Sequence, residues 1–215
     1  MELSSKILSD ITVHSKYARF NHELQRREVW NEIIDRNKSM HIKKYPQLTK
    51  EIEAVYERSV YPKKVLPSMR SLQFAGKAIE RNPSRIYNCA YLPIEDTRAF
   101  SEIMFLLLGG TGVGYSVQKQ HIAKLPNVVG PSNGSRRYIV GDSIEGWADA
   151  VRILVEAYFD GKRRPEFDFS EIRPKGTELV VSGGKAPGAE PLNLCLQQIE
   201  DILRAAVGRA IRPIE

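Results

Sequence analysis

Apolar residues recur at three- and four-residue steps through most of the first 60 positions, and this spacing predicts helices. The positions concerned are Tyr17, Phe20, Leu24, Trp30, Ile33 and Ile34, followed beyond Pro46 by Ile52, Val55, Tyr56 and Val60. The charged residues between them predict solvent-facing sides. Because Tyr61-Pro62 and Leu66-Pro67 end the pattern, we expect a helical N-terminal region over residues 1–66.

After Ser68 the helical spacing of apolar residues gives way to short apolar runs, and these favour strands and loops over residues 68–91. Apolar positions from Phe100 to Leu108 then return to helical spacing, and Gly109-Gly110 follow them as a C-terminal cap would. Alternation at Tyr115 and Val117 indicates a strand after this glycine run.

Glycine and proline are frequent over residues 126–141, so we expect a loop or a partly ordered insertion there. Asp142, with Glu145 three residues later, is typical of a helix N-terminus, and the apolar face of that helix extends to Tyr158. A short strand over 167–169, a buried strand over 179–181 and a last helix containing Leu196 and Leu203 complete the predicted elements.

Composition limits the class of protein. The chain has 215 residues, 42% hydrophobic and 27% charged, as is usual for a globular protein. No run approaches the roughly 18 apolar residues of a membrane span, and the N-terminus lacks the apolar core of a signal peptide, so we expect a cytoplasmic protein without membrane contact. Two cysteines form neither a disulfide framework nor a zinc motif, and we expect no metal site.

The net charge of +6 is the balance of 32 basic and 26 acidic residues, and the basic residues occur as scattered pairs. A nucleic-acid-binding protein would gather such residues into one stripe with aromatic side chains, so nucleic acid is not an expected partner. A modest positive field also suits an enzyme that handles small polyphosphates.

Two glycine-rich segments are candidate ligand-binding loops. Gly110, Gly112 and Gly114 do not form the dinucleotide fingerprint, and Tyr115 stands where a P-loop requires lysine. A structural turn, or a backbone that a ligand can approach closely, remains possible. The second segment, 183–188, lies between a predicted strand and a helix, where Lys185 could pair with a phosphate or belong to a surface loop.

The cysteines present a similar choice. Cys89 lies in a short apolar run and is either an inert core thiol or a reagent, whereas Cys195 on the last predicted helix fits a core position. Asp96 is placed to cap the helix that follows it.

The order of these motifs is more informative than any one of them. Segments 88–93, 109–114, 168–174 and 182–188, with Asp96 between the first two, form a series that resembles the N-terminal half of a ribonucleotide reductase catalytic subunit. The adenosylcobalamin-dependent (class II) branch is the most similar, and segments 17–30 and 146–147 resemble it too.

This resemblance implies an α/β fold in which residues 67–215 form the first half of a ten-stranded barrel, with an insertion at about 122–172. It implies reduction of a ribonucleoside triphosphate or diphosphate by thiyl-radical chemistry. Cys89 corresponds to the N-terminal member of a redox-active dithiol pair. Ser71, Asn88 and Gly110 match substrate-binding positions, and Asp96, Gly183, Gly184 and Lys185 match positions that bind or relay a deoxynucleotide effector.

The implied partners are adenosylcobalamin, a thioredoxin-type reductant and a C-terminal half, because the radical cysteine and the second dithiol cysteine are expected outside this sequence. The chain is therefore expected to be inactive alone. Three alternatives remain: a free-standing deoxynucleotide-sensing module, part of a class I-type reductase, and a basic protein associated with nucleic acid.

Overall fold

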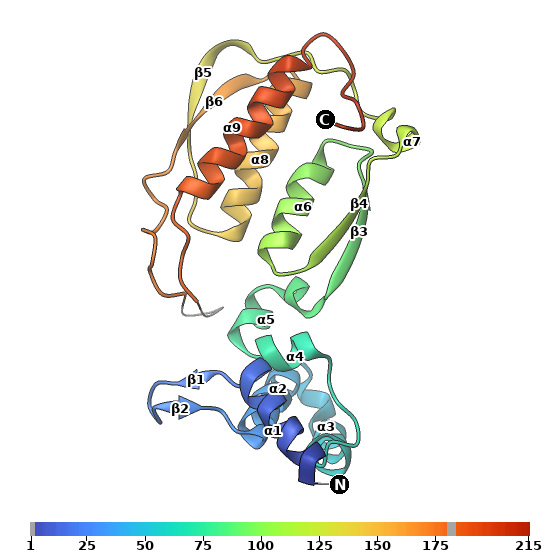
Figure 1. Cartoon of the computed structure of the whole chain (residues 1–215), viewed down its shortest axis with the longest axis vertical. Coiled ribbons are helices and arrows are strands. Elements are labelled where there is room, and N and C mark those ends of the chain that lie inside the picture. Colours follow the sequence, from blue (N-terminus) through green and yellow to red (C-terminus); the bar gives the residue numbers. More distant parts are fainter. Residues whose placement is uncertain (1–2, 180–183) are drawn as a thin grey trace. The chain divides into compact units, whose positions relative to one another are not determined.

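The computed structural model describes residues 3–179 and 184–215 of a mixed α/β chain. The backbone divides into two compact units, Met1–Tyr87 and Asn88–Glu215 (Figure 1). The first is almost entirely helical, and the second combines helices with two small parallel sheets.

The first unit is built from short helices and one small hairpin. Its elements are α1 (Leu3–Lys16), β1 (Phe20–Asn21), β2 (Arg26–Arg27), α2 (Trp30–Lys44), η1 (Pro46–Leu48), α3 (Thr49–Val55), the π-helix η2 (Tyr56–Val60), α4 (Met69–Phe74), α5 (Lys77–Arg81) and η3 (Pro83–Ile86). Ile33 and Ile34 of α2 are fully buried and pack with Tyr56, Val60 and Leu72. The helical pattern expected up to residue 66 thus continues to Ile86.

Two expectations for this unit were wrong. Residues 17–27 do not continue a helix, because the Asn21 side chain accepts hydrogen bonds from the N–H groups of Glu23 and Leu24 and closes a turn between β1 and β2. Residues 69–81 form helices and not strands. The Ser68 hydroxyl accepts the Ser71 N–H and begins α4, as an N-cap does.

The second unit contains two parallel strand–helix–strand arrangements. The first is β3 (Cys89–Pro93), α6 (Arg98–Leu108) and β4 (Gly112–Ser116). After α7 (Lys119–Ile122), the second is β5 (Ser132–Ile139), α8 (Ile144–Phe159) and β6 (Arg163–Asp168), and α9 (Glu190–Ala205) follows. A helix between each pair of strands is the connection that parallel pairing requires.

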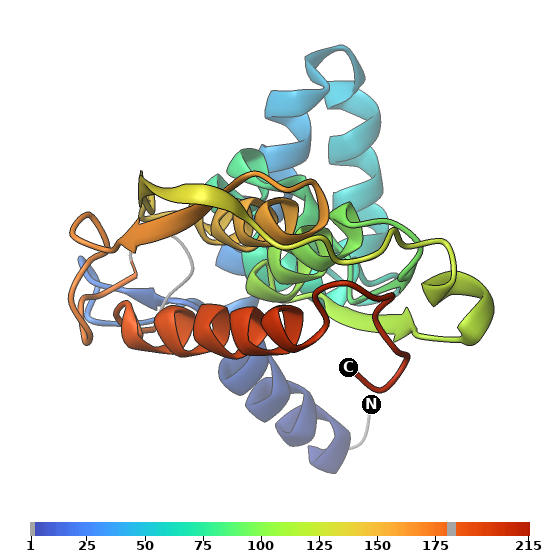
Figure 2. The same ribbon diagram turned by 90° about the horizontal axis from the view of Figure 1, so that it is seen from above.

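The core of the second unit lies around α8, which packs against α6, α9 and β6 (Figures 1 and 2). Val151, Leu154 and Val155 of α8 are buried with Leu192 and Leu196 of α9. The apolar spacing along the sequence predicted both helices, because each buries one continuous face.

The predicted loop at 126–141 is wrong over its second half, which forms β5. This strand is almost entirely exposed, so it lacks the alternation of a half-buried strand. Gly134, at φ +86°, lies within the irregular register between Ser132 and Ser135.

Two smaller expectations also changed. The N-cap of α8 is Ser143, whose hydroxyl accepts the Gly146 N–H at 3.0 Å, while Asp142 pairs with Arg173 at 2.6 Å. Residues 180 and 181 of the predicted buried strand lie outside the described residues; beside them, Leu179 donates its N–H to the Gly184 carbonyl.

Candidate functional site

The Cys89 side chain lies on the exposed face of the β3–β4 sheet. In the parallel register Cys89 is opposite Gly112 and Tyr91 is opposite Gly114, and partners in register share a face. Ala90, Leu92 and Val113 alternate with them and are half-buried, on strands that pack against α6. The sheet therefore covers α6 with one face and presents the thiol on the other.

The glycine run after α6 is a helix cap in the structure. Gly110 adopts φ +91°, its N–H donates to the Leu107 carbonyl at 2.9 Å, and the Thr111 N–H donates to the Leu106 carbonyl at 3.0 Å. These are the two hydrogen bonds of a Schellman motif. This confirms the predicted cap.

The backbone amides of the run are thus already paired. The next N–H, that of Gly112, donates to the Asn88 carbonyl at 2.8 Å. The amides of Gly110, Thr111 and Gly112 consequently do not form an anion cradle. The part of the run that a ligand could contact is the exposed surface of Gly112 and Gly114 beside Cys89.

The two thiols differ in their surroundings. Both cysteines are free; Cys89 is exposed and Cys195 on α9 is half-buried. Burial raises the pKa of the Cys195 thiol, which lowers its nucleophilic thiolate fraction. An external reductant or a reagent in solution can therefore reach Cys89 more readily.

Asn88 and Gly110 lie at the same end of the β3–β4 sheet as Cys89, whereas Asp96 lies at the other end. The 11 residues of α6 run from the carboxyl end of β3 back to the amino end of β4. At 1.5 Å per residue, this separates Asp96 from Gly110 by about 16 Å. Asp96 itself caps α6, because its Oδ1 accepts the N–H groups of Arg98 and Ala99 at 2.8 and 3.2 Å.

The second glycine segment lies in a small hairpin before α9. Gly183 lies outside the described residues. Gly184 adopts φ +85°, and Lys185 is exposed, with its backbone in an isolated antiparallel β-bridge to that of Glu178. No hydrogen bond or ion pair among the described residues joins Asp96 to Gly184 or Lys185, so the effector-binding role of this group stays a prediction.

Ser71 belongs to the first unit, on α4, and is 7% exposed. The buried Asn37 side chain donates to the Ser71 hydroxyl at 2.8 Å and to the Ser71 carbonyl at 3.1 Å. Tyr56 in turn donates to Asn37 Oδ1 at 2.5 Å. Burial raises the pKa of Tyr56 to about 12, which keeps its hydroxyl protonated as the donor.

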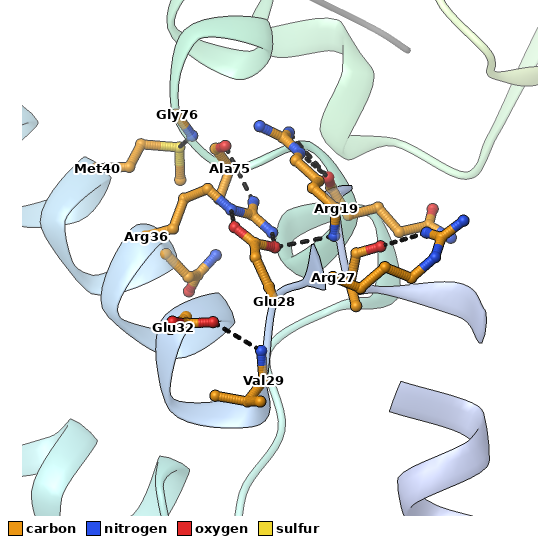
Figure 3. A network of polar contacts seen from close by, with 12 residues as sticks. Arg19, Arg27, Glu28, Val29, Glu32, Arg36, Met40, Ala75 and Gly76 are labelled. Atoms are coloured by element: carbon orange, nitrogen blue, oxygen red, sulfur yellow. Dashed lines mark hydrogen bonds and ion pairs between the residues drawn. The ribbon is translucent and has the colours of Figure 1, made fainter. Parts of the chain in front are cut away.

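Two arginines hold the carboxyl end of α4, as Figure 3 shows. Arg19 donates from Nε and Nη2 to the Gln73 carbonyl at 3.1 and 2.9 Å, and Arg36 donates to the Ala75 carbonyl at 3.1 Å. A six-residue helix is marginal on its own. These side chains supply partners for carbonyls at its end.

Glu28 links the two arginines. It accepts both Nε and Nη2 of Arg36 at 2.8 Å and the Arg19 backbone N–H at 3.0 Å. Burial, and then the Arg36 charge, lower the pKa of Arg19 to about 10, and Glu28 opposes this shift. No sequence pattern predicted this network, because the arginines bind backbone carbonyls that lie about 40 to 55 positions further along the chain.

A hollow of about 520 Å³ between α6 and α8 was also not predicted. Its lining residues are Ser101, Glu102, Phe105, Leu106, Glu145, Ala148 and Asp149. Glu102 and Asp149 already pair with Arg98 and Arg152, each at 3.0 Å. Their carboxylates are therefore part of surface ion pairs along the two helices.

Two further findings concern the described part of the chain as a whole. No group of three or more His, Cys, Asp or Glu side chains is arranged there to bind a metal ion. No helix within residues 3–179 and 184–215 has the length and apolar character that crossing a membrane requires.

Comparison with known proteins gives a consistent result. Residues 116–203 match the family model of the insertion domain of B12-dependent ribonucleotide reductase. The chain is 25% identical over 240 residues to a probable adenosylcobalamin-dependent ribonucleoside-triphosphate reductase of Dictyostelium discoideum, an alignment covering 95% of this chain and 31% of that protein. It is 30% identical over 175 residues to the adenosylcobalamin-dependent enzyme of Euglena gracilis, covering 77% of this chain and 24% of that protein.

The fold is similar to that of a solved B12-dependent (class II) ribonucleotide reductase. The TM-score is 0.80 at 24% identity, and the match covers 95% of this chain and 38% of that one. The chain therefore spans about a third of the length of the proteins it matches.

Proposed function

Because the chain is homologous over 95% of its length to adenosylcobalamin-dependent ribonucleotide reductases, we propose that it is one part of such an enzyme. The complete enzyme would convert a ribonucleotide to the corresponding 2′-deoxyribonucleotide. The observation that carries this proposal is the exposed thiol of Cys89 on the open face of β3–β4, beside Gly112 and Gly114, which carry no side chains.

In the proposed reaction Cys89 is one of two thiols that supply the reducing equivalents. The C2′–O bond of the substrate breaks, the oxygen leaves as water, and a hydrogen replaces it on C2′. The two thiols lose their hydrogens and form a disulfide, so that electrons and atoms balance. A thioredoxin-type dithiol then reopens the disulfide by exchange, which requires a thiol that solvent can reach, as Cys89 is.

Asn88 and Gly110 would contact the substrate, since the register places both at the Cys89 end of the sheet. Ser71, on α4 of the first unit, remains a predicted substrate-binding residue, and the Asn37 side chain donates a hydrogen bond to its hydroxyl. Asp96, Gly184 and Lys185 would bind or relay a deoxynucleotide effector, together with Gly183. The length of α6 between Asp96 and Gly110 supports an effector site distinct from the substrate site.

The rest of the enzyme would complete the β3–β4 sheet. Among the described residues these two strands pair only with each other, and a two-stranded sheet is marginally stable without further strands or cover. We propose that β3 and β4 are the first strands of a ten-stranded barrel whose other half carries the second dithiol cysteine and the radical cysteine.

Adenosylcobalamin, when bound, supplies the radical that initiates reduction. The hollow between α6 and α8 does not fit a corrin ring, since it has only about 520 Å³ and is lined by the acidic residues Glu102, Glu145 and Asp149. We therefore assign this cofactor to the remaining part of the enzyme. The match of residues 116–203 to the B12-dependent insertion domain favours this branch over a class I reductase.

Reconstitution tests the proposal. The chain is combined with the remaining polypeptide, adenosylcobalamin, a ribonucleoside triphosphate, thioredoxin, thioredoxin reductase and NADPH, and deoxynucleotide is measured by chromatography. Cys89→Ser should abolish thioredoxin-coupled turnover, whereas the matched variant Cys195→Ser should retain it. Full turnover by Cys89→Ser would show that Cys89 is not a redox thiol.

A further inference from the structure

The first helix of the chain differs from the other long helices in what it buries. The helices α2, α8 and α9 have 15 or 16 residues, and each of them buries at least four. The helix α1 has 14 residues and buries none. Its packing against the first unit is therefore slight, and its helical structure needs a further explanation.

α1 contacts the first unit along one side. Val13 is half-buried and packs against the buried cluster that contains Ile33. Lys63 Nζ donates to Ser9 Oγ at 2.8 Å and lies 3.8 Å from the Asp10 carboxylate. Because Ser9 and Val13 are four residues apart, they lie on the same side of the helix. This side faces the body of the first unit.

The opposite side of α1 is apolar and exposed. Ile7 lies two residues before Ser9, which places it about 200° round the helix. Ile11 stands in the same relation to Val13. Ile7 and Ile11 are 51% and 59% exposed. With Leu3 at 74% and Leu8 at 66%, they form a surface that we call the α1 stripe: Leu3, Ile7, Leu8 and Ile11.

Neither length nor propensity accounts for this helix. Helices shorter than about 12–15 residues are marginal in water without packing. α1 contains no alanine and four serines, and no acidic residue lies in its first turn to favour the N-terminus. Its apolar residues at helical spacing do account for it if another surface covers them, because burial of an apolar stripe is what stabilises most helices.

A second copy of the chain and a lipid surface both fit the α1 stripe poorly. At roughly 100 Å² for a fully exposed aliphatic side chain, the four residues offer about 250 Å² of apolar surface, whereas a stable dimer buries about 800 Å² on each partner. Helices that lie on lipid carry aromatic residues and a polar face rich in lysine and arginine. α1 has no aromatic residue, and its polar positions are mostly hydroxyl side chains.

The remaining polypeptide of the proposed enzyme fits better. The chain covers 31% and 38% of two proteins that it matches, so the rest of such a protein is about twice as long as this chain. That polypeptide would also complete the β3–β4 sheet. A stripe too small to hold a partner alone is sufficient as one of several contacts with the same partner.

We propose that the α1 stripe is a docking surface, and that an apolar patch on the remaining polypeptide of the reductase covers it. This inference rests on the proposed function, since that function supplies the partner. It assigns no part in substrate or effector binding to α1. It explains why a helix that buries nothing within its own unit presents four apolar side chains on one side.

Hydrogen exchange followed by mass spectrometry measures the docking. In the chain alone the amides of α1 should exchange fast, because a helix without buried residues opens readily. Adding the remaining polypeptide should slow their exchange by about tenfold or more. Light scattering of the chain alone, and exchange with vesicles of phosphatidylcholine and phosphatidylglycerol, test the other two occupants.

A double variant, Ile7→Gln with Ile11→Gln, tests the stripe itself. Glutamine favours a helix at least as well as isoleucine, and neither position is buried, so the thermal midpoint should not change. The dissociation constant for the remaining polypeptide, measured by calorimetry, should rise about ten- to thirtyfold, because about half of each isoleucine side chain loses its cover. The control is Leu48→Gln with Val55→Gln, at positions 44% and 45% exposed elsewhere in the first unit, which should leave the affinity unchanged.

Four results would overturn the inference. They are an unchanged affinity of the double variant, an equal loss in the control, a dimer of the chain that the double variant abolishes, and protection of α1 by vesicles but not by the polypeptide. Each leaves the proposed function standing if the unmodified chain still forms deoxynucleotide in the reconstituted enzyme. Conversely, docking that depends on Ile7 and Ile11, without deoxynucleotide formation, would keep the docking surface and remove the proposed function.

Discussion

Arg164 on β6 and Glu200 on α9 form a two-pronged ion pair, with Nε to Oε1 at 2.5 Å and Nη2 to Oε2 at 2.8 Å. Tyr158 of α8 donates its hydroxyl to the same carboxylate at 2.9 Å. Glu200 is only 9% exposed. One carboxylate thus joins the strand and both long helices of the second unit.

Replacing Glu200 with glutamine should destabilise the chain. The variant leaves Arg164 without its counter-ion and changes the acceptor for Tyr158, and we expect a loss of about 2 kcal/mol in the free energy of unfolding. Urea unfolding followed by circular dichroism measures it. Asp201→Asn, at the exposed neighbouring position, should change stability by less than about 0.5 kcal/mol. Equal effects of the two variants would contradict the structural role of Glu200.

The same carboxylate gives the stability a pH dependence. The Arg164 hydrogen bonds hold the pKa of Glu200 below its usual 4.5. A carboxyl group with a lowered folded-state pKa stabilises the fold above its unfolded pKa, and the contribution is lost as the pH falls through the folded value. The stability difference between the unmodified chain and Glu200→Gln should therefore be constant from pH 7 to 5.5 and shrink below about pH 4.5. Unfolding curves across this range measure it, and a difference independent of pH would refute it.

Tyr56→Phe should weaken the first unit. It removes the donor to Asn37 Oδ1 and leaves that buried acceptor unpaired, which costs about 1–3 kcal/mol. The thermal midpoint and urea unfolding report the loss. Tyr45→Phe is the control, because Tyr45 is 41% exposed and its ring lies near Lys44 at the surface. A neutral Tyr56→Phe would show that the hydrogen bond to Asn37 contributes nothing.

Gly146→Ala should disrupt the start of α8. The new Cβ would meet the Gly141 carbonyl oxygen at 2.4 Å, and backbone on both sides must move. We expect a loss of about 2–3 kcal/mol. Gly112→Ala, with a closest contact of 3.5 Å, should be close to neutral in the same thermal unfolding experiment. The reverse order would mean that backbone crowding at Gly146 does not govern this position.

Cys89 should react before Cys195. Cys89 is exposed, while Cys195 is half-buried with a pKa raised by burial, so at pH 8 we expect alkylation of Cys89 to be faster by about tenfold or more. Peptide mapping after limited iodoacetamide treatment measures the ratio, and unfolding in urea should equalise the two rates. Faster labelling of Cys195 in the folded chain would contradict the assigned burial.

Local sequence was sufficient where the cause of a structure is local. The end of α6 at Gly109 and Gly110 was predicted, because a glycine beyond a helix readily takes the left-handed conformation. The faces of α8 and α9 were predicted from spacing, because each helix buries one apolar stripe.

Prediction failed where the stabilising partner is distant or the side chains face solvent. The strand β5 is paired with β6, whose residues come about 30 positions later, and its exposed side chains carry no alternation. The helix α4 depends on Arg19, Arg36 and Asn37 from an earlier part of the chain. Propensity within either segment does not reveal these contacts.

The sequence by itself determined the family resemblance, which the match at residues 116–203 supports. It also identified Cys89 and the glycine run at 109–114 as candidate functional residues. Only the tertiary structure decided that Cys89 lies opposite Gly112 on an open face, that the loop amides are already paired, and that Asp96 lies at the far end of α6. The reason is physical. Motif order follows the covalent chain, whereas strand register and helix crossing bring together residues about 20 positions apart through non-local hydrogen bonds and packing.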